Sequence, residues 1–195
     1  ELEKRLKGKG ITLDKQKIED GERHALFTLV SPFLKDIVYY TNKNSINLFA
    51  EALGELISPT DYARTVKAEL SGMGIDSCGI TLKDASGLSP ANAVPAEVFT
   101  DLLIWAKGHL SDVFVASLPQ GNVDWGLRIY SDHPILRGNI LAKTGSMSGV
   151  RALAGYLKTQ RGETLAFTIL VNNYVGDPVK VQEIIRDLLK EFADK

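Results

Sequence analysis

The sequence predicts an α+β domain in which helices cover an antiparallel sheet. Three apolar runs of strand length follow one another near the end of the chain, at residues 140–146, 150–158 and 165–172. A short polar turn ending at Gly162 separates the last two runs, as an antiparallel hairpin requires. A helical pattern then follows, and its apolar face must be buried against another element. The hairpin sheet is the nearest such surface.

The last helix has the clearest boundaries of these elements. It is predicted to begin after Asp177, a capping residue, with Pro178 at the first helical position. Its apolar side chains recur at helical spacing, and they are Val181, Ile184, Ile185, Leu188 and Phe192. We expect this stripe to lie against the sheet.

The start of the chain is polar and rich in turn signals. We interpret residues 1–22 as a pair of strands that connects to another part of the protein. Residues 23–30 alternate between polar and apolar side chains, as a strand does. The Ser31-Pro32 pair is typical of a helix start, because a capping hydroxyl precedes a proline at the first helical position.

Further helices are predicted between this start and the sheet. The helix that begins at Pro32 is expected to end in a polar break at residues 41–45, and a second helix resumes at Leu48. Two more helices, at 59–70 and 95–107, each open with a proline.

Composition is that of an ordinary globular protein. Apolar residues make up 44% of the chain and charged residues 24%, which argues against disorder. The formal net charge of -1 gives no field that would attract nucleic acid, so no nucleic-acid partner is expected. Cys78 is the only cysteine and the three histidines show no metal-type spacing, so we predict no metal or other cofactor.

A lysine, a glycine and two hydroxyls lie together on the first predicted strand, at Lys143-Thr144-Gly145-Ser146. Thr144 and Ser146 are two positions apart, so their hydroxyls share one face of the strand, and Lys143 adds positive charge. Gly145 removes a side chain that would obstruct a ligand laid along the strand. The pattern indicates an anion-binding edge. Its alternative is an edge strand that a lysine protects from unwanted pairing.

A second candidate motif, Ser45-Ile46-Asn47, lies at the polar break between two predicted helices. A serine and an asparagine two positions apart can face one pocket if the break is a turn. Equally, both residue types favour turns and caps because they form local hydrogen bonds. The two motifs together are more specific. A Ser-x-Asn followed 98 positions later by Lys-Thr-Gly matches two of the three motifs of penicillin-recognising enzymes.

Five sequence blocks, at residues 31–37, 43–51, 84–89, 142–146 and 153–156, resemble a single family in their order and spacing. They look like the D-alanyl-D-alanine carboxypeptidase/endopeptidases of the class C, low-molecular-mass penicillin-binding type, which are DacB-like. The resemblance covers roughly Arg23 to the end of the chain. It implies a β-lactamase/transpeptidase-like fold.

The resemblance also implies a serine-type hydrolase of the cell wall. Its substrates would be peptidoglycan stem peptides that end in D-Ala-D-Ala, and β-lactam antibiotics would acylate it. A periplasmic or other extracytoplasmic location is expected from that substrate.

The family's catalytic roles, carried over to the matching residues here, fall on Ser45, Asn47 and Lys143. Ser45 would relay a proton toward the leaving amine, and Lys143 would hold the Ser45 hydroxyl and lend it positive charge. Asn47 would hydrogen-bond a side amide of the substrate.

The substrate-binding roles implied by the resemblance fall on the strand motif. Thr144 and Ser146 would bind the terminal carboxylate, with Gly145 between them leaving the edge accessible. The backbone N–H of Ser146 would form half of an oxyanion hole. Met147 would line the pocket for the side chain that precedes the scissile bond.

The family's nucleophile motif, Ser-x-x-Lys, does not occur in this sequence. Ser31 comes nearest, but Lys35 follows it one position too late. We therefore expect this chain to be a carboxy-terminal fragment. The missing amino-terminal segment of the same protein would supply the nucleophile, and the fragment alone would be inactive. Residues 1–22 would be strands returning from an inserted domain, and residues 23–195 would form the carboxy-terminal part of the transpeptidase-like domain.

Two other functions remain open on the sequence. A catalytically inactive, cell-wall-binding member of the same fold would lack Ser-x-x-Lys upstream of Glu1 as well. A serine β-lactamase would carry a glutamate-bearing loop between the two motifs to activate water. The glutamates between Glu51 and Lys143 are Glu55, Glu69 and Glu97, and each is predicted to lie on a helix surface.

Overall fold

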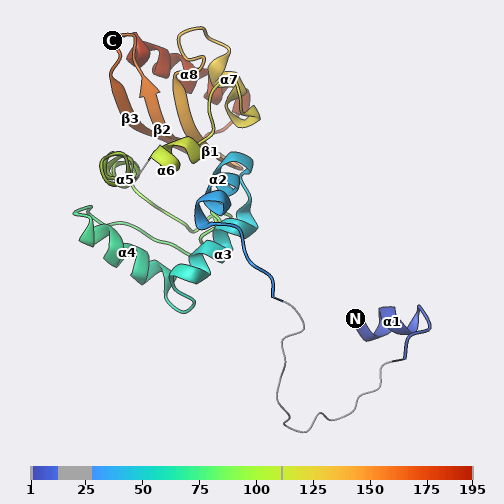
Figure 1. Cartoon of the computed structure of the whole chain (residues 1–195). Helices are drawn as coiled ribbons and strands as arrows, with labels where there is room; N and C mark the ends of the chain where they lie inside the picture. Colours follow the sequence, from blue (N-terminus) through green and yellow to red (C-terminus); the bar gives the residue numbers. More distant parts are fainter. Residues whose placement is uncertain (1, 13–27, 111, 195) are drawn as a thin grey trace. The chain divides into compact units, whose positions relative to one another are not determined.

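The computed structural model describes residues 2–12, 28–110 and 112–194 (Figure 1). Contacts divide the chain into two units, Glu1–Ser31 and Pro32–Lys195, each described here by itself. The predicted boundary after residue 22 lies outside the described residues, so the division into returning strands and a partial domain stays a prediction.

The first unit contains a short helix, α1 (Leu2–Lys7). Backbone bonds from Ile11 to Leu6 and from Gly10 to Lys7, both 3.0 Å, close its carboxy-terminal end. Gly10 adopts φ 72°, the left-handed conformation in which glycine commonly ends a helix. The prediction of paired strands is therefore wrong over Leu2–Lys7, because these residues form a helix that Gly10 terminates.

The remaining parts of the amino-terminal prediction have different outcomes. Residues 13–22 of the predicted strand pair lie outside the described residues, as do 23–27 of the strand predicted at 23–30. Thr28, Leu29 and Val30 are described, and they form no regular structure.

The second unit contains the predicted sheet and the predicted helices near their expected places, although the helix predicted to open at Pro59 begins at Tyr62 after an Asp61 cap. Its helical elements are α2 (Leu34–Asn44), α3 (Asn47–Ile57), α4 (Tyr62–Gly72), α5 (Ala96–His109), α6 (Asp112–Ser117), the 3-10 helix η1 (Trp125–Leu127), α7 (Arg128–Ser131) and α8 (Pro178–Ala193). Three of these, the short helices α6, η1 and α7, were not predicted.

The helix predicted to open at Ser31-Pro32 begins later than expected. α2 starts at Leu34, its N-cap is Phe33 in extended backbone, and no side chain caps it. The predicted polar break is also narrower, because α2 continues through Asn44 and only Ser45 and Ile46 separate it from α3. Thr41 and Asn44 donate to carbonyl oxygens within α2, and Asn42 and Lys43 find partners in other elements, so these polar side chains do not interrupt the helix.

The three predicted strands are confirmed as β1 (Ile140–Met147), β2 (Val150–Lys158) and β3 (Thr164–Asn172). They form an antiparallel sheet in the order β1-β2-β3. The α+β class predicted from the sequence is therefore correct.

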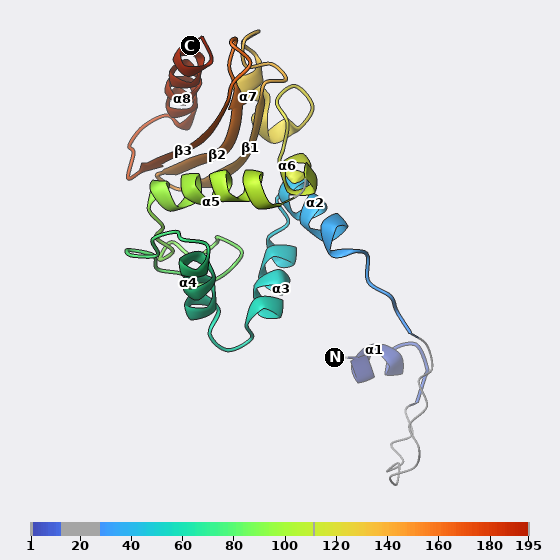
Figure 2. The same ribbon diagram turned by 60° about the vertical axis from the view of Figure 1, so that its left-hand side comes forward.

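Helices cover both faces of this sheet (Figures 1 and 2). On one face, Leu153 of β2 packs with Ile185 and Leu189 of α8 in the main core. On the other face, Tyr156 packs with Leu103 of α5 and donates a hydrogen bond to its carbonyl oxygen at 2.6 Å. The sheet is thus fixed between two helices, which gives β1 a defined position.

α8 begins as predicted, with the Asp177 carboxylate accepting from the N–H of Val179 at 2.8 Å. The predicted apolar stripe is only half correct. Val181 and Ile185 pack against the core, whereas three other members remain exposed by 39–69%, namely Ile184, Leu188 and Phe192. Apolar residues form two adjacent rows on this helix, and the row at positions 181, 185, 189 and 193 is the one that meets the sheet.

Candidate active site

The two motifs from distant parts of the sequence meet through a direct contact. The Lys143 Nζ donates a hydrogen bond to the Ser45 Oγ at 2.9 Å, and a second one to the Thr144 carbonyl oxygen at 2.8 Å. Lys143 comes from β1, and Ser45 lies between α2 and α3. The pairing of a lysine with a serine that the sequence suggested is therefore present in the structure.

Ser45 reaches this position through an unusual backbone conformation. It ends α2 with φ 53° and ψ 51°, in the left-handed region that side-chain-bearing residues seldom occupy. The chain turns sharply there, and Ile46 still donates to the Thr41 carbonyl at 3.1 Å. Asn47 then begins α3 and is exposed. The motif is a tight turn between two helices.

Burial shapes the electrostatics of Lys143. Desolvation lowers the pKa of its ammonium below the ordinary lysine value of 10.5. A lysine that is more easily deprotonated, and that holds a hydroxyl, can take part in proton transfer.

The outer edge of β1 offers backbone groups to a ligand. Ala142 N–H donates outward to Pro119, and Gly121 N–H donates to the Ile140 carbonyl, both at 2.9 Å. Backbone direction alternates along a strand, so the N–H groups of Thr144 and Ser146 point to this same outer edge. Within the described ranges, no backbone–backbone hydrogen bond occupies the edge from Lys143 to Met147.

The strand alternation separates the ammonium from the hydroxyls. Thr144 and Ser146 lie opposite Leu153 and Arg151, on the face toward α8, whereas Lys143 lies on the other face. The lysine and the hydroxyls can therefore act on one ligand only at the strand edge, where both faces are accessible.

Gly145 has a packing role that the sequence analysis did not anticipate. A Cβ at this position would lie 3.2 Å from the Cβ of Ala152 on β2. The close approach of the two strands therefore favours glycine here, whether or not a ligand lies along the strand.

An open pocket of about 650 Å³ lies at the carboxy-terminal end of β1. Its lining includes Ser146 and Met147 from the end of β1, Ser148 from the turn that follows, and Arg151 and Tyr174 from neighbouring segments. The Arg151 guanidinium lies over the Tyr174 ring, 5.5 Å from its centre. Ser146 and Met147, the two predicted substrate-binding residues farthest along β1, therefore border a hollow in the surface.

A carboxylate ties the loop at residues 84–89 to α3. Glu51 lies one turn after Asn47, and its Oε2 accepts from the N–H of Ala85 at 3.1 Å and of Ser86 at 3.0 Å. Asp84 in turn accepts from the N–H groups of Gly87 and Ser89 within the loop. These bonds fix a block that the sequence analysis noted but to which it gave no role.

The sequence analysis missed an ion pair beside the motif. Lys43, two positions before Ser45, pairs with Asp124 at 3.0 Å. Neither residue had been assigned a role, and the only signal in the sequence is that Lys43 lies next to the Ser-x-Asn motif.

The glutamates Glu55, Glu69 and Glu97 are exposed on helices, as predicted. Among the described residues, no cluster of three or more His, Cys, Asp or Glu side chains could hold a metal ion. No helix in the described ranges has the length and apolar character needed to cross a membrane.

Comparison with known proteins identifies the family. The model of the D-Ala-D-Ala carboxypeptidase 3 (S13) family matches residues 1–195. The chain belongs to the S13 family. The family resemblance inferred from the five sequence blocks is therefore confirmed, and with it the penicillin-binding carboxypeptidase class.

Curated relatives carry the same assignment. The chain is 33% identical over 194 residues to a D-alanyl-D-alanine carboxypeptidase of Actinomadura sp. (strain R39), with 92% of this chain aligned. It is 32% identical over 183 residues to the D-alanyl-D-alanine carboxypeptidase DacB of Haemophilus influenzae, with 86% aligned. The chain therefore spans only about a third of the length of these two relatives, 35% and 37%.

Solved structures agree on the fold. Penicillin-binding protein 4 (dacB) of Haemophilus influenzae, in complex with a β-lactam, matches all of this chain and 50% of its own, with a TM-score of 0.83 and 28% identity. A variant of the extended-spectrum β-lactamase TLA-1 matches 83% of this chain and 63% of its own, with a TM-score of 0.66 and 17% identity. The predicted β-lactamase/transpeptidase-like fold is confirmed.

Proposed function

We propose that this chain forms part of a serine-type D-Ala-D-Ala carboxypeptidase/endopeptidase that acts on peptidoglycan stem peptides. The observation that carries the proposal is the 2.9 Å hydrogen bond from Lys143 to Ser45, made between the two sequence motifs on which the family resemblance was based. The nucleophilic serine comes from a segment outside these 195 residues, because no serine in the sequence is followed by a lysine at the third position.

The substrate peptide lies along the outer edge of β1 as an added strand. Peptides often bind sheet edges in this way, because main-chain hydrogen bonds supply affinity without depending on side chains. The outward N–H of Ser146 serves as one oxyanion donor. The hydroxyls of Thr144 and Ser146 bind the terminal carboxylate, and Gly145 keeps the edge between them clear.

Acyl transfer then proceeds in two steps. The external serine Oγ attacks the carbonyl carbon of the penultimate D-alanine, and its proton passes to the lysine of its own Ser-x-x-Lys motif, which later restores the proton that Ser45 gives up. The scissile C–N bond then breaks to give an acyl-enzyme. Ser45 passes a proton to the nitrogen of the departing D-alanine, and the Lys143 ammonium stabilises the Ser45 oxygen while it does so. Water attacks the ester and releases the shortened peptide.

Two further residues contact the substrate peptide in this proposal. Asn47 hydrogen-bonds a side amide, since it is exposed at the start of α3 close to Ser45. Met147 lines the pocket for the side chain that precedes the scissile bond, and it borders the hollow at the end of β1. β-Lactams acylate the same serine as cyclic analogues of the peptide. The peptidoglycan substrate places the protein in the periplasm or another extracytoplasmic space.

Labelling with a fluorescent penicillin tests the proposal. The 195-residue chain alone is expected to show no covalent label, and a longer version that includes the sequence preceding Glu1 is expected to label. Labelling of the 195-residue chain would refute the external nucleophile and make Ser45 and Ser31 the first serines to replace. A longer version that carries Ser-x-x-Lys but takes no label would refute the enzymatic function.

The stability of the label separates two enzyme classes. The proposed carboxypeptidase is expected to keep the penicilloyl group much longer than a β-lactamase, which would hydrolyse it rapidly and release free penicilloate. Mass spectrometry of the protein at successive times measures this difference directly.

A further inference from the structure

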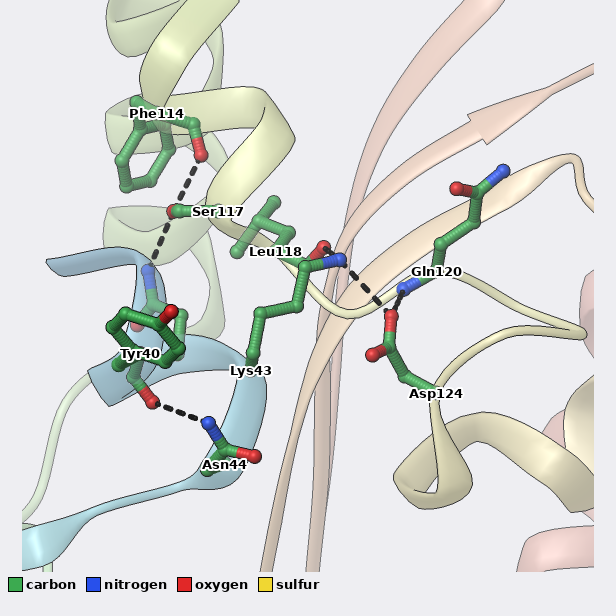
Figure 3. Close-up of polar contacts among 9 residues, drawn as sticks. Tyr40, Lys43, Asn44, Phe114, Ser117, Leu118, Gln120 and Asp124 are labelled. Carbon is green, nitrogen blue, oxygen red and sulfur yellow. Dashed lines mark hydrogen bonds and ion pairs between the residues drawn. The ribbon is translucent and has the colours of Figure 1, made fainter. Parts of the chain in front are cut away.

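The last turn of α2 is tied to the segment that precedes β1 by a partly buried ion pair (Figure 3). The Lys43 Nζ donates to the Asp124 Oδ2 at 3.0 Å and to the Leu118 carbonyl oxygen at 2.7 Å. The same Asp124 oxygen accepts from the Gln120 N–H at 2.6 Å. One lysine therefore binds both ends of the segment from Leu118 to Asp124.

A second contact joins the same turn of α2 to α6, which ends just before this segment. The Asn42 side-chain amide donates to the Ser117 hydroxyl at 2.8 Å, and that hydroxyl donates to the Phe114 carbonyl of α6 at 2.6 Å. Ser117 is fully buried. Two consecutive residues of α2 therefore anchor its carboxy-terminal end, immediately before Ser45.

The segment held by Lys43 is also fixed to β1. Backbone hydrogen bonds connect Pro119 to Ala142 and Gly121 to Ile140, and Gln120 bridges Leu141. Lys143 is the next residue along that strand. A continuous set of contacts therefore runs from Lys43 through Asp124 to β1, and it closes where Lys143 meets Ser45.

Ser45 requires such support. A serine in the left-handed region is less stable than one in a helix or strand, and such conformations persist where the surrounding structure imposes them. The side chains of Lys43 and Asp124 are only 13% and 21% exposed, so water screens their attraction less than at the surface.

We infer that the Lys43–Asp124 ion pair is a positioning device that sets the distance between Ser45 and Lys143. The expected effect on the acylation rate rests on the proposed function. The effect on the distance between Ser45 and Lys143 does not. Lys43 and Asp124 act through Ser45 and Lys143 and contact no substrate.

The kinetic test uses a longer version of the protein that is acylated by penicillin. Lys43→Met and Asp124→Asn are each expected to lower the first-order acylation rate by about 10-fold or more, with the penicillin dissociation constant changed less than about 3-fold. Because the two residues act as one unit, the double variant is expected to be about as slow as either single variant. Lys43→Arg, which keeps the charge, should recover at least part of the rate.

Lys190→Met is the matched control. Lys190 also pairs with a carboxylate, that of Asp187 at 3.5 Å, but these two side chains belong to α8 and are more exposed, at 32% and 56%. Its removal should leave the acylation rate unchanged. Wild-type acylation by Lys43→Met would overturn the inference, and so would a double variant whose loss equals the product of the two single losses.

A second readout separates this inference from the proposed function. The side-chain ¹⁵N resonance of Lys143, assigned with Lys143→Met, should shift in Lys43→Met and stay in place in Lys190→Met. If penicillin acylates no version of the protein, the proposed function fails, and this resonance alone decides the inference. An unchanged resonance in Lys43→Met would overturn it.

Discussion

The hydroxyl of Ser45 lies 2.9 Å from the ammonium of Lys143, although the two residues are 98 positions apart. Ser45 holds that place in a left-handed backbone conformation at the end of α2. The site therefore depends on a local conformation that the residue type does not favour, and on contacts that compensate for it.

Replacing Ser45 separates backbone strain from chemistry. Glycine adopts the left-handed conformation freely, so Ser45→Gly is expected to be about 1 kcal/mol more stable than Ser45→Ala, which keeps the strain. Both variants lose the hydroxyl and should slow acylation by penicillin about 100-fold or more in a longer version of the protein. Urea unfolding and labelling kinetics measure the two effects. Equal stabilities would show that Ser45 is unstrained.

The buried ammonium of Lys143 predicts a pH-dependent stability. Its pKa is lowered in the folded state, so between that value and 10.5 the unfolded chain binds more protons, and stability rises with pH. Lys143→Met removes the burial cost and is expected to melt a few degrees above the wild type at pH 7. The difference should narrow as the pH approaches 10.5, and calorimetry across this range checks it. A constant difference would contradict the lowered pKa.

Gly155 is predicted to tolerate no side chain. A Cβ there would collide with the Leu141 carbonyl oxygen and lie 2.5 Å from the Ala142 Cα, next to Lys143. Gly155→Ala is expected to cost about 2 kcal/mol or more in unfolding free energy, because β1 and β2 must separate. Gly108→Ala in α5 is the control. No atom lies within 4 Å of its added Cβ, and alanine there should be neutral or slightly stabilising. Equal effects of the two changes would refute the prediction.

Asp84 provides an acid-sensitive contribution. Burial opposes its ionisation, but hydrogen bonds from Asn92, Gly87 and Ser89 outweigh this and lower the pKa of the carboxyl below 3.8. A group with a depressed pKa stabilises the fold above its unfolded value and loses that contribution as the pH falls through its folded value. Asp84→Asn should therefore cost about 1 kcal/mol at pH 7 and progressively less below about pH 4. Chemical denaturation at several pH values tests this, and a cost that stays constant as the pH falls below about 4 would count against it.

The sequence could predict the sheet and its last helix because their signals are local. The apolar runs, the turn at Gly162 and the cap at Asp177 each lie within a few residues of the structure they specify. Local signals failed where contact with another part of the fold decides which side of an element is buried. α8 carries two apolar rows, and either could be buried as far as the sequence pattern shows. Contact with the sheet buries the row that contains Ile185 and leaves Ile184 exposed.

The amino-terminal helix was missed for a related reason. Gly10 is compatible with a strand turn and with a helix end, and the choice depends on the hydrogen bonds that Leu6 and Lys7 make. The polar end of α2 is a second example. Asn42 and Lys43 looked like a break, but their partners at Ser117 and Asp124 are more than 70 positions away.

The sequence alone determined the family of this protein, because motifs such as Ser45-Ile46-Asn47 and Lys143-Thr144-Gly145 are read from residue types in order and spacing. It also determined the α+β class, since the spacing of apolar residues and the residue types found at turns are both local properties of the sequence. Only the tertiary structure decided how the motifs meet. The left-handed turn at Ser45, the lowered pKa of Lys143 and the ion pair of Lys43 with Asp124 all depend on contacts between distant segments, whose distances and burial arise only when the chain is packed.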